Sequence, residues 1–171
     1  RDCLLSRGLG DVYKRQVTRS TDVNELKRLA DIPGLHALQL HAPFQGDLEG
    51  ERQLLRRARE AAGSLDIWRA VNMREADFAA LSGQPFSEVE ALVLDSGNGG
   101  TGTRFNWSTI PTEIKSKSFL AGGLHIGNLD EALSVATAGL DLNSGLEYAP
   151  GRKDSALISQ AFSAIRNYTH S

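Results

Sequence analysis

Two glycine-containing turns in the second half of the sequence have the residue types of an anion site. Gly122 and Gly123 follow one predicted strand, and Ser144 and Gly145 follow the next. Glycine N–H groups approach an anion without a Cβ in the way, and residues 144–148 predict a one-turn helix whose first N–H groups favour a phosphate. Each turn alone is equally well an ordinary tight turn or a Ser N-cap. Together, one strand–helix unit apart, they predict a phosphate site.

Two further polar residues end predicted strands at the same edge of the sheet. Asp95 precedes a glycine-rich loop, residues 96–105, which suits either a mobile cover over a ligand or a merely flexible loop. Asp95 is either a turn or cap residue or a general acid, because partial desolvation suits a carboxyl to proton donation. His41 is either a hydrogen-bonded strand-end residue or part of the site. The edge therefore combines a candidate acid with a candidate anion site.

Short apolar segments alternate with longer amphipathic ones, which is the pattern of repeated βα units and a parallel sheet. Strands are predicted at residues 36–41, 66–71, 90–95, 118–121 and 140–143. Helices are predicted at residues 21–30, 47–62, 74–82, 107–114, 128–138 and 155–168. In such folds the loops after the strands open to one side and form the ligand-binding face. All the candidate residues above follow strands, so we expect them on that face.

The predicted helix at residues 47–62 is rich in charge. Spacing of three and four residues predicts a solvated face on which basic and acidic side chains pair, formed by Arg52, Arg56, Arg57, Arg59, Glu49, Glu51 and Glu60. The two tryptophans, Trp68 and Trp107, are predicted as core residues or as packing between helices and sheet.

The overall composition excludes several classes of protein. A net charge of −2 leaves no basic stripe for nucleic acid, and no stretch approaches the roughly 18 apolar residues of a membrane span. The single cysteine, Cys3, has no internal disulfide partner, and no apolar run suits a signal peptide, so we expect a cytoplasmic protein. Because no His, Cys, Asp or Glu cluster has metal-ligand spacing, we expect no metal.

Longer motifs make the pattern specific. They are Leu94-Asp95-Ser96, residues 99–107, Leu120-Ala121-Gly122-Gly123-Leu124 with Asn128, residues 141–147, and residues 150–154. In this order they closely resemble phosphoribosylanthranilate isomerase of tryptophan biosynthesis, and Gln39-Leu40-His41 resembles that family's strand-four motif. The resemblance covers about residues 17–168. It implies an α/β fold of the (β/α)8 TIM-barrel family.

The resemblance also implies an activity and roles. The family isomerises N-(5-phosphoribosyl)anthranilate to 1-(2-carboxyphenylamino)-1-deoxyribulose 5-phosphate, an Amadori rearrangement that needs neither cofactor nor metal. Asp95 matches the general acid, which protonates the ribose ring oxygen. The implied substrate and phosphate contacts are Gly122, Gly123, Ser144, Gly145 and His41.

Some family features have no match in this sequence. The general base is a strand-one cysteine in a Lys-x-Cys-Gly motif, which Cys3 does not match, and a Ser-Pro-Arg substrate motif is also not found. Ala42 and Asn106 stand where glycine and aspartate are usual. We therefore expect residues 1–16 to be a non-native or unmatched segment. Residues 17–171 are then the C-terminal part of the isomerase, an incomplete barrel covering about strands 4–8, whose open edges favour self-association.

Two alternatives remain at this point. One is another phosphate-binding barrel such as indole-glycerol-phosphate synthase, against which the spacing from Asp95 to the glycine-rich loop argues. The other is a catalytically incompetent partial barrel that binds a phosphosugar but lacks the general-base cysteine. In each case the expected partner is a small phosphosugar rather than nucleic acid or a membrane.

Overall fold

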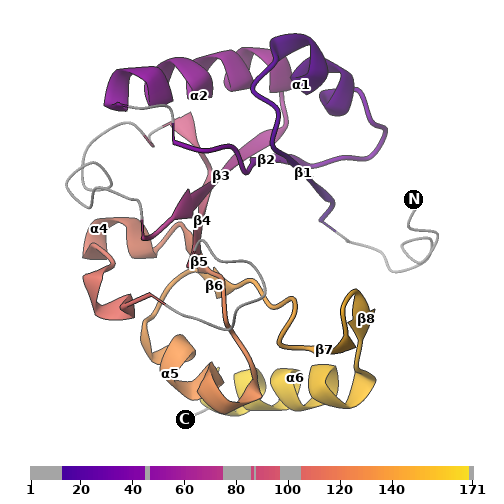
Figure 1. Cartoon of the computed structure of the whole chain (residues 1–171), viewed down its shortest axis with the longest axis vertical. Helices are drawn as coiled ribbons and strands as arrows, with labels where there is room; N and C mark the ends of the chain where they lie inside the picture. Colours follow the sequence, from indigo (N-terminus) through magenta and orange to yellow (C-terminus); the bar gives the residue numbers. More distant parts are fainter. Residues whose placement is uncertain (1–12, 45–46, 75–85, 87, 97–104, 170–171) are drawn as a thin grey trace.

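The computed structural model describes residues 13–44, 47–74, 86, 88–96 and 105–169. Within these ranges six parallel strands form one sheet in their order along the chain, and a two-stranded antiparallel hairpin follows. The sheet strands are β1 (Arg15–Thr18), β2 (Ala37–Leu40), β3 (Asp66–Asn72), β4 (Ala91–Asp95), β5 (Ser118–Leu120) and β6 (Gly139–Leu140). The hairpin strands are β7 (Glu147–Ala149) and β8 (Arg152–Lys153). The sheet is curved, as Figure 1 shows.

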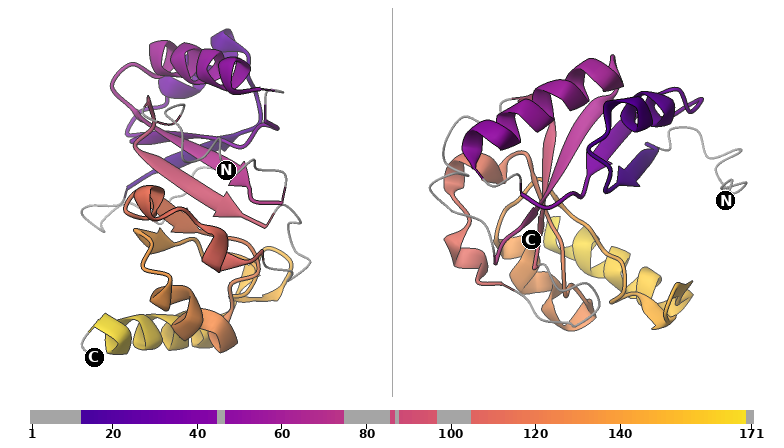
Figure 2. Two further views of the ribbon diagram at one scale, coloured as in Figure 1. Left: turned by 90° about the vertical axis from the view of Figure 1, so that its left-hand side faces the viewer. Right: turned by 45° about the horizontal axis from the view of Figure 1, so that its top comes forward.

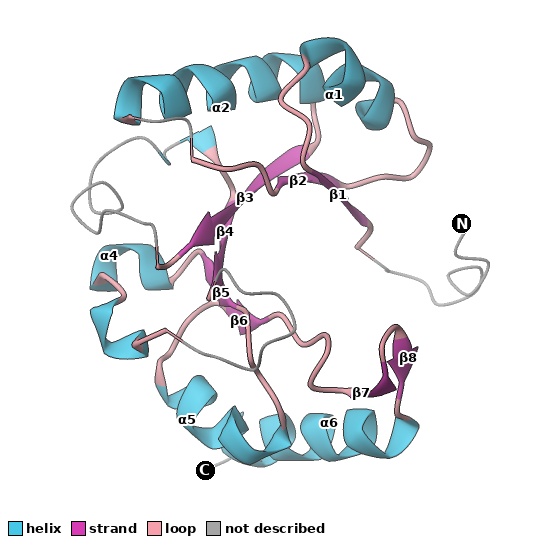
Figure 3. Ribbon diagram, in the orientation of Figure 1, coloured by secondary structure: helices cyan, strands magenta, loops and turns pink. Residues whose placement is uncertain are grey.

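Helices lie on the outer side of the curved sheet, as Figure 3 shows. They are α1 (Val23–Ala30), α2 (Leu48–Ala62), α4 (Thr112–Lys115), α5 (Leu129–Ser134) and α6 (Ser155–Thr169), with short 3-10 segments η3 (Trp107–Thr109) and η4 (Ile126–Asn128). In the left view of Figure 2, α1 and α2 lie at one end of the molecule and α6 at the other. This α/β arrangement agrees with the predicted fold class.

The sheet has a buried outer layer and a separate inner layer. Side chains alternate between the two faces of a strand. Those that face the helices belong to the large core cluster, among them Leu38, Leu40, Ile67, Leu92 and Leu94. The inner cluster contains Ala70, Val93 and Ala121, against which Trp68 and Phe119 pack with ring centroids 4.5 Å apart. Trp107 is buried in the large cluster, so both tryptophans pack as predicted.

The predicted helix boundaries at the first two helices are confirmed to within two residues. Asp22 caps α1 by accepting a hydrogen bond from the Glu25 N–H at 2.9 Å, and Asp47 caps α2 through the Gly50 N–H at 2.7 Å. Gly63 ends α2 with a φ of +59°, a conformation that glycine adopts without steric cost.

The predicted solvated face of α2 is wrong for two of its members. Glu51 is fully buried and binds Arg69 of β3, and Arg59 pairs with Glu90 beside β4. Glu51 lies on the same side of the helix as Leu54 and Leu55, so the charge is carried into the core with the apolar side chains. Of the expected pairs, Arg52 and Glu49 do lie 3.9 Å apart on the surface.

The C-terminal region departs further from prediction. Residues 144–146 form a turn and Glu147 and Tyr148 already belong to β7, so the predicted one-turn helix at 144–148 is wrong, and α5 is shorter than the predicted 128–138. The predicted helix at 74–82 and the glycine-rich loop fall largely outside the described residues. Strand β1 adds a sixth strand to the five predicted and includes Arg15 and Gln16, whereas the division at residue 16 stays a prediction. No helix in the described part of the chain is long and apolar enough to cross a membrane.

Candidate active site

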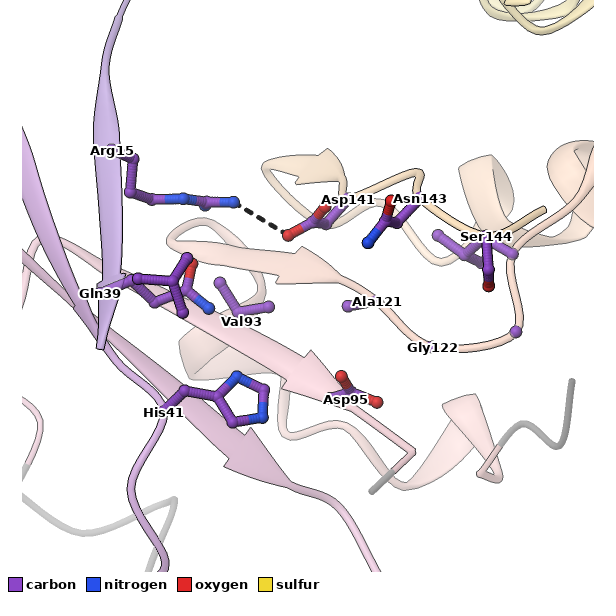
Figure 4. Close-up of a pocket in the computed structure, with 13 residues that line it drawn as sticks. Arg15, Gln39, His41, Val93, Asp95, Ala121, Gly122, Asp141, Asn143 and Ser144 are labelled. Carbon is purple, nitrogen blue, oxygen red and sulfur yellow. Dashed lines mark hydrogen bonds and ion pairs between the residues drawn. The ribbon is translucent and has the colours of Figure 1, made fainter. Parts of the chain in front are cut away.

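A pocket of about 480 Å³ lies on the inner side of the sheet. Figure 4 shows its walls, which come from β1, β2, β4 and the segments after β5 and β6. It brings together five of the six predicted site residues, namely His41, Asp95, Gly122, Gly123 and Ser144. The sixth, Gly145, does not line it. The predicted acid and the predicted phosphate turns therefore share one pocket.

The turn after β5 is held in a fixed shape. Gly122 and Gly123 have φ values of +76° and +68°, and the buried Asn128 donates to the Gly123 carbonyl at 2.9 Å. The side-chain oxygen Oδ1 of Asn128 in turn accepts from the backbone N–H of His125 at 2.9 Å. No described residue accepts a hydrogen bond from the N–H of Gly122 or Gly123. These two donors are free for an anion, as a phosphate turn requires.

Gly145 positions the second turn against the first. It forms a parallel bridge with His125, and a Cβ at this position would lie 1.8 Å from the Leu124 carbonyl oxygen. Any side chain there would push the two turns apart. Gly145 therefore serves the site through backbone packing, which brings Ser144 to the pocket.

The hairpin of β7 and β8 holds the same segment from outside. The Lys153 ammonium donates to the Asn143 carbonyl at 2.8 Å and to the Glu147 carboxylate at 2.7 Å. The hydrogen bond from Lys153, followed by one from the Gly151 N–H, holds the pKa of Glu147 below its usual value. Lys153 thereby ties the pocket-lining segment after β6 to the hairpin.

Asp95 ends β4 beside the first glycine turn. Its carboxyl is half-buried, and the Ser96 hydroxyl lies 3.5 Å from Oδ1. A Cβ on Gly122 would lie 2.7 Å from the same oxygen, so glycine is what allows the turn to approach the carboxyl. His41 is exposed at the mouth, where Figure 4 shows its imidazole directed into the pocket. The backbone N–H of His41 donates to the Thr18 carbonyl at 2.8 Å, which fixes the end of β2 to β1.

The pocket lining also includes residues that were not predicted as site residues, among them Arg15, Asp141 and Gln39. Arg15 and Asp141 form an ion pair at 3.0 Å, and the Arg15 guanidinium lies 4.4 Å from the Trp68 ring centroid. Gln39 is 4% exposed, and none of the described residues donates a hydrogen bond to its Oε1. Strand alternation offered a signal for Gln39, which precedes His41 by two residues and shares its face. The Arg15–Asp141 pair joins the first and last strands of the described sheet. The two residues are far apart in sequence, so no local sequence pattern predicts their contact.

Within the described ranges, no group of three His, Cys, Asp or Glu side chains could hold a metal ion. Cys3 lies outside the described residues, so its position relative to the pocket is not part of this geometry.

A family model described as N-(5'phosphoribosyl)anthranilate (PRA) isomerase matches residues 10–164. The tryptophan biosynthesis protein TrpCF of Corynebacterium glutamicum is 38% identical over 144 residues, covering 80% of this chain and 30% of that protein. TrpCF of Yersinia pestis is 35% identical over 153 residues, covering 89% and 30%. The chain thus spans less than a third of the length of these curated relatives.

Solved structures agree with the sequence matches. The phosphoribosyl anthranilate isomerase of Thermus thermophilus superposes with a TM-score of 0.70 at 25% identity, covering 91% of this chain and 73% of that one. The isomerase of Pyrococcus furiosus, at 20% identity and a TM-score of 0.63, covers 90% and 73% and supports the same fold. The chain belongs to the phosphoribosylanthranilate isomerase family.

Proposed function

We propose that this chain serves the isomerisation of N-(5-phosphoribosyl)anthranilate to 1-(2-carboxyphenylamino)-1-deoxyribulose 5-phosphate. The observation that carries the proposal is the single pocket in which Asp95 lies beside the Gly122–Gly123 turn. Family membership gives the reaction class, and the pocket supplies groups that suit it.

The phosphate end of the ligand is assigned to the two turns. The N–H groups of Gly122 and Gly123 are free of acceptors among the described residues, and Ser144 supplies a hydroxyl at the same wall. Backbone donors fixed in this way bind an oxyanion with little reorganisation. Asn128 and Gly145 act indirectly, by fixing the two turns against each other.

The position of Asp95 suits proton transfer to the ribose ring oxygen. That oxygen is attached to C4, one carbon from the C5 that carries the phosphate. A donor for it must therefore lie close to the phosphate turns, and Asp95 lies close to Gly122. In the proposed step the protonated Asp95 carboxyl donates its proton to the ring oxygen as the bond from that oxygen to C1 breaks.

A second candidate function is phosphosugar binding without turnover. The isomerisation also needs a base that removes the proton from C2, and the described lining of the pocket contains no thiol to match the family's cysteine. Asp95 and the phosphate turns are present in both candidates. Turnover of phosphoribosylanthranilate, followed by the change in its fluorescence, separates them.

The remaining expectations form part of the proposal. We place the activity in the cytoplasm and take a small phosphosugar as the partner. Strands β1 and β6 end the described sheet, and exposed backbone at such edges can pair with a second copy. Sedimentation at several protein concentrations tests this association, and we expect it to show a defined dimer.

The phosphate assignment is tested by calorimetric titration with the borohydride-reduced product, 1-(2-carboxyphenylamino)-1-deoxyribitol 5-phosphate. We expect Gly123→Val to abolish binding, because a branched side chain at φ +68° distorts the turn and obstructs its donors. Gly151→Val is the matched control, since Gly151 has a similar φ of +73° and lies in the β7–β8 turn with open space around it. Equal binding by wild type and Gly123→Val would show that this turn does not bind the phosphate.

A further inference from the structure

The side-chain amide of Asn143 has a fixed orientation in the wall of the pocket. The Lys153 ammonium donates to Asn143 Oδ1 at 2.5 Å, to the Asn143 backbone carbonyl at 2.8 Å and to the Glu147 carboxylate at 2.7 Å. An ammonium group has three N–H donors and no acceptor, so only the oxygen of the amide can face it. Lys153 therefore fixes the amide with its NH2 group turned away from the hairpin.

This NH2 group is open to a ligand. Asn143 is exposed and lines the pocket, and Figure 4 shows its amide nitrogen directed into the pocket. Asp141 lines the pocket too, whereas Leu142 between them packs against the core. No described residue accepts a hydrogen bond from the amide nitrogen of Asn143. The pocket thus contains a side-chain donor of fixed direction in addition to the backbone donors of the glycine turn.

The position of this donor identifies the part of a ligand that it would meet. In Figure 4, Asn143 lies between Ser144 and Asp141 on one wall of the pocket, and Asp95 lies on the opposite wall. The proposed function assigns the phosphate to the two turns and the C4 oxygen to Asp95. The next oxygen along the ligand from the phosphate is the one on C3. A donor that directly precedes Ser144 and faces Asp95 across the pocket is placed to reach it.

We propose that Asn143 is a substrate-binding residue that donates a hydrogen bond, through Nδ2, to the C3 oxygen of the phosphoribosyl ligand, and that Lys153 is the positioning residue that orients its amide. This inference rests on the function proposed above. The backbone donors of the glycine turn suit any phosphate ester. Asn143 adds a preference for ligands that carry an oxygen on C3, because a ligand without it leaves the amide donor unpaired.

The test compares two ligands, the reduced product and its 3-deoxy analogue, by calorimetric titration of wild type and Asn143→Ala. We expect wild type to bind the 3-deoxy analogue roughly 3- to 10-fold more weakly than the reduced product, which is the effect of one hydrogen bond. Asn143→Ala should bind the two ligands with about equal affinity, because the donor is gone. Any effect of the substitution on the phosphate turns is common to both ligands and cancels in the comparison.

Asn143→Ala keeps the hairpin attached, since Lys153 retains the Asn143 carbonyl and the Glu147 carboxylate as acceptors. The matched control is Asn24→Ala, at an exposed position on α1, which should keep the wild-type preference between the two ligands.

Lys153→Met tests the positioning role. It keeps an unbranched side chain and removes the ammonium, so the Asn143 amide is free to rotate. We expect the preference for the reduced product over the 3-deoxy analogue to fall below the wild-type value. If the hairpin only supports the fold, Lys153→Met weakens the binding of both ligands by the same factor, and the positioning role of Lys153 is wrong.

Equal binding of the two ligands by wild type overturns the inference before any variant is made. A preference that Asn143→Ala keeps unchanged shows that another residue contacts the C3 oxygen, and it overturns the inference as well. Failure of wild type to bind the reduced product at all contradicts the proposed function. Binding of the reduced product without a preference over the 3-deoxy analogue contradicts the Asn143 assignment alone.

Discussion

The Arg15 guanidinium lies 3.0 Å from the Asp141 carboxylate, although the two residues belong to opposite ends of the sheet. Arg15 is the first residue of β1, and Asp141 directly follows β6. Because β1 and β6 are the outermost strands of the described sheet, the pair bridges its inner side. The Arg15–Asp141 ion pair therefore crosses the open inner side of the curved sheet and connects its two outermost strands.

We expect this pair to contribute about 0.5–1 kcal/mol, because both side chains are partly exposed, at 22% and 30%. The measurement is a double-mutant cycle with Arg15→Met and Asp141→Asn, followed by urea unfolding at low and high salt. The coupling energy should fall as salt screens the pair. If the loss of unfolding free energy in the double variant equals the sum of the losses in the two single variants, the contact contributes nothing to stability.

The buried pair of Glu51 and Arg69 should matter far more. The Arg69 side chain also donates to the carbonyls of Ala42 and Ala70, both at 2.8 Å, so it joins α2, β3 and the segment after β2. Removing Glu51 leaves a buried cation, and we expect Glu51→Leu to cost about 3–5 kcal/mol in urea unfolding. The control, Glu49→Leu on the exposed face of α2, should cost no more than about 1 kcal/mol. If Glu51→Leu and Glu49→Leu lower the free energy of unfolding by similar amounts, the Glu51–Arg69 pair is not buried as described.

The stability of the fold should depend on pH through Glu90. Partial burial opposes its ionisation, but hydrogen bonds from Arg59 and from the Ile67 N–H outweigh this and lower its pKa. A lowered pKa in the folded state means that the stabilisation is complete above the unfolded value, near 4.3, and is lost as the pH falls through the folded value. The Glu90 side chain is 43% exposed, so we expect only about 0.5–1 kcal/mol.

The measurement is urea unfolding of wild type and Glu90→Gln between pH 3 and pH 7. The difference between the two proteins should be constant from pH 7 to about pH 5 and shrink below that. A difference that grows as the solution becomes more acidic would reverse the assigned direction of the pKa shift.

Much of this fold is predictable because local physics fixes it. The Asp22 and Asp47 caps and the glycine after α2 mark helix ends within two residues. Apolar segments predict β2 to β5 to within one residue at each end for the same reason, whereas the predicted strand at residues 140–143 shares only Leu140 with β6. The segment after β6 was mispredicted, since a serine followed by glycine also suits a helix start. There the close contact of Gly145 with Leu124, a residue distant in sequence, decides the conformation.

Part of the candidate site was likewise predictable from local sequence, and part was not. Asp95 and the glycine turns were found because strand ends and glycines are visible in the sequence. Arg15 and Gln39 were missed, since their importance depends on partners, or on the lack of one, that only the folded chain defines. The burial of Glu51 was missed because spacing along a helix indicates which charges can pair but not which face meets the sheet.

Asp95 is expected to matter in the transition state more than in binding. We propose to test this in a hybrid in which the part of the Thermus thermophilus isomerase that precedes the matched region replaces residues 1–12. In this hybrid Asp95→Asn should lower kcat by about 10²–10⁴-fold and leave the affinity for the reduced product within a few-fold. Steady-state fluorescence kinetics and calorimetry measure the two quantities. Equal turnover with asparagine would make Asp95 a structural strand-end residue.

The most direct test of the account is a crystal structure of this chain with the reduced product bound. We predict that the phosphate is bound by the N–H groups of Gly122 and Gly123 and by the Ser144 hydroxyl. We also predict that the Asp95 carboxylate lies within about 2.6–3.2 Å of the C4 oxygen, the atom that belongs to the ring in the substrate. A phosphate bound elsewhere, or a C4 oxygen out of reach of Asp95 while the phosphate occupies the turns, would contradict it.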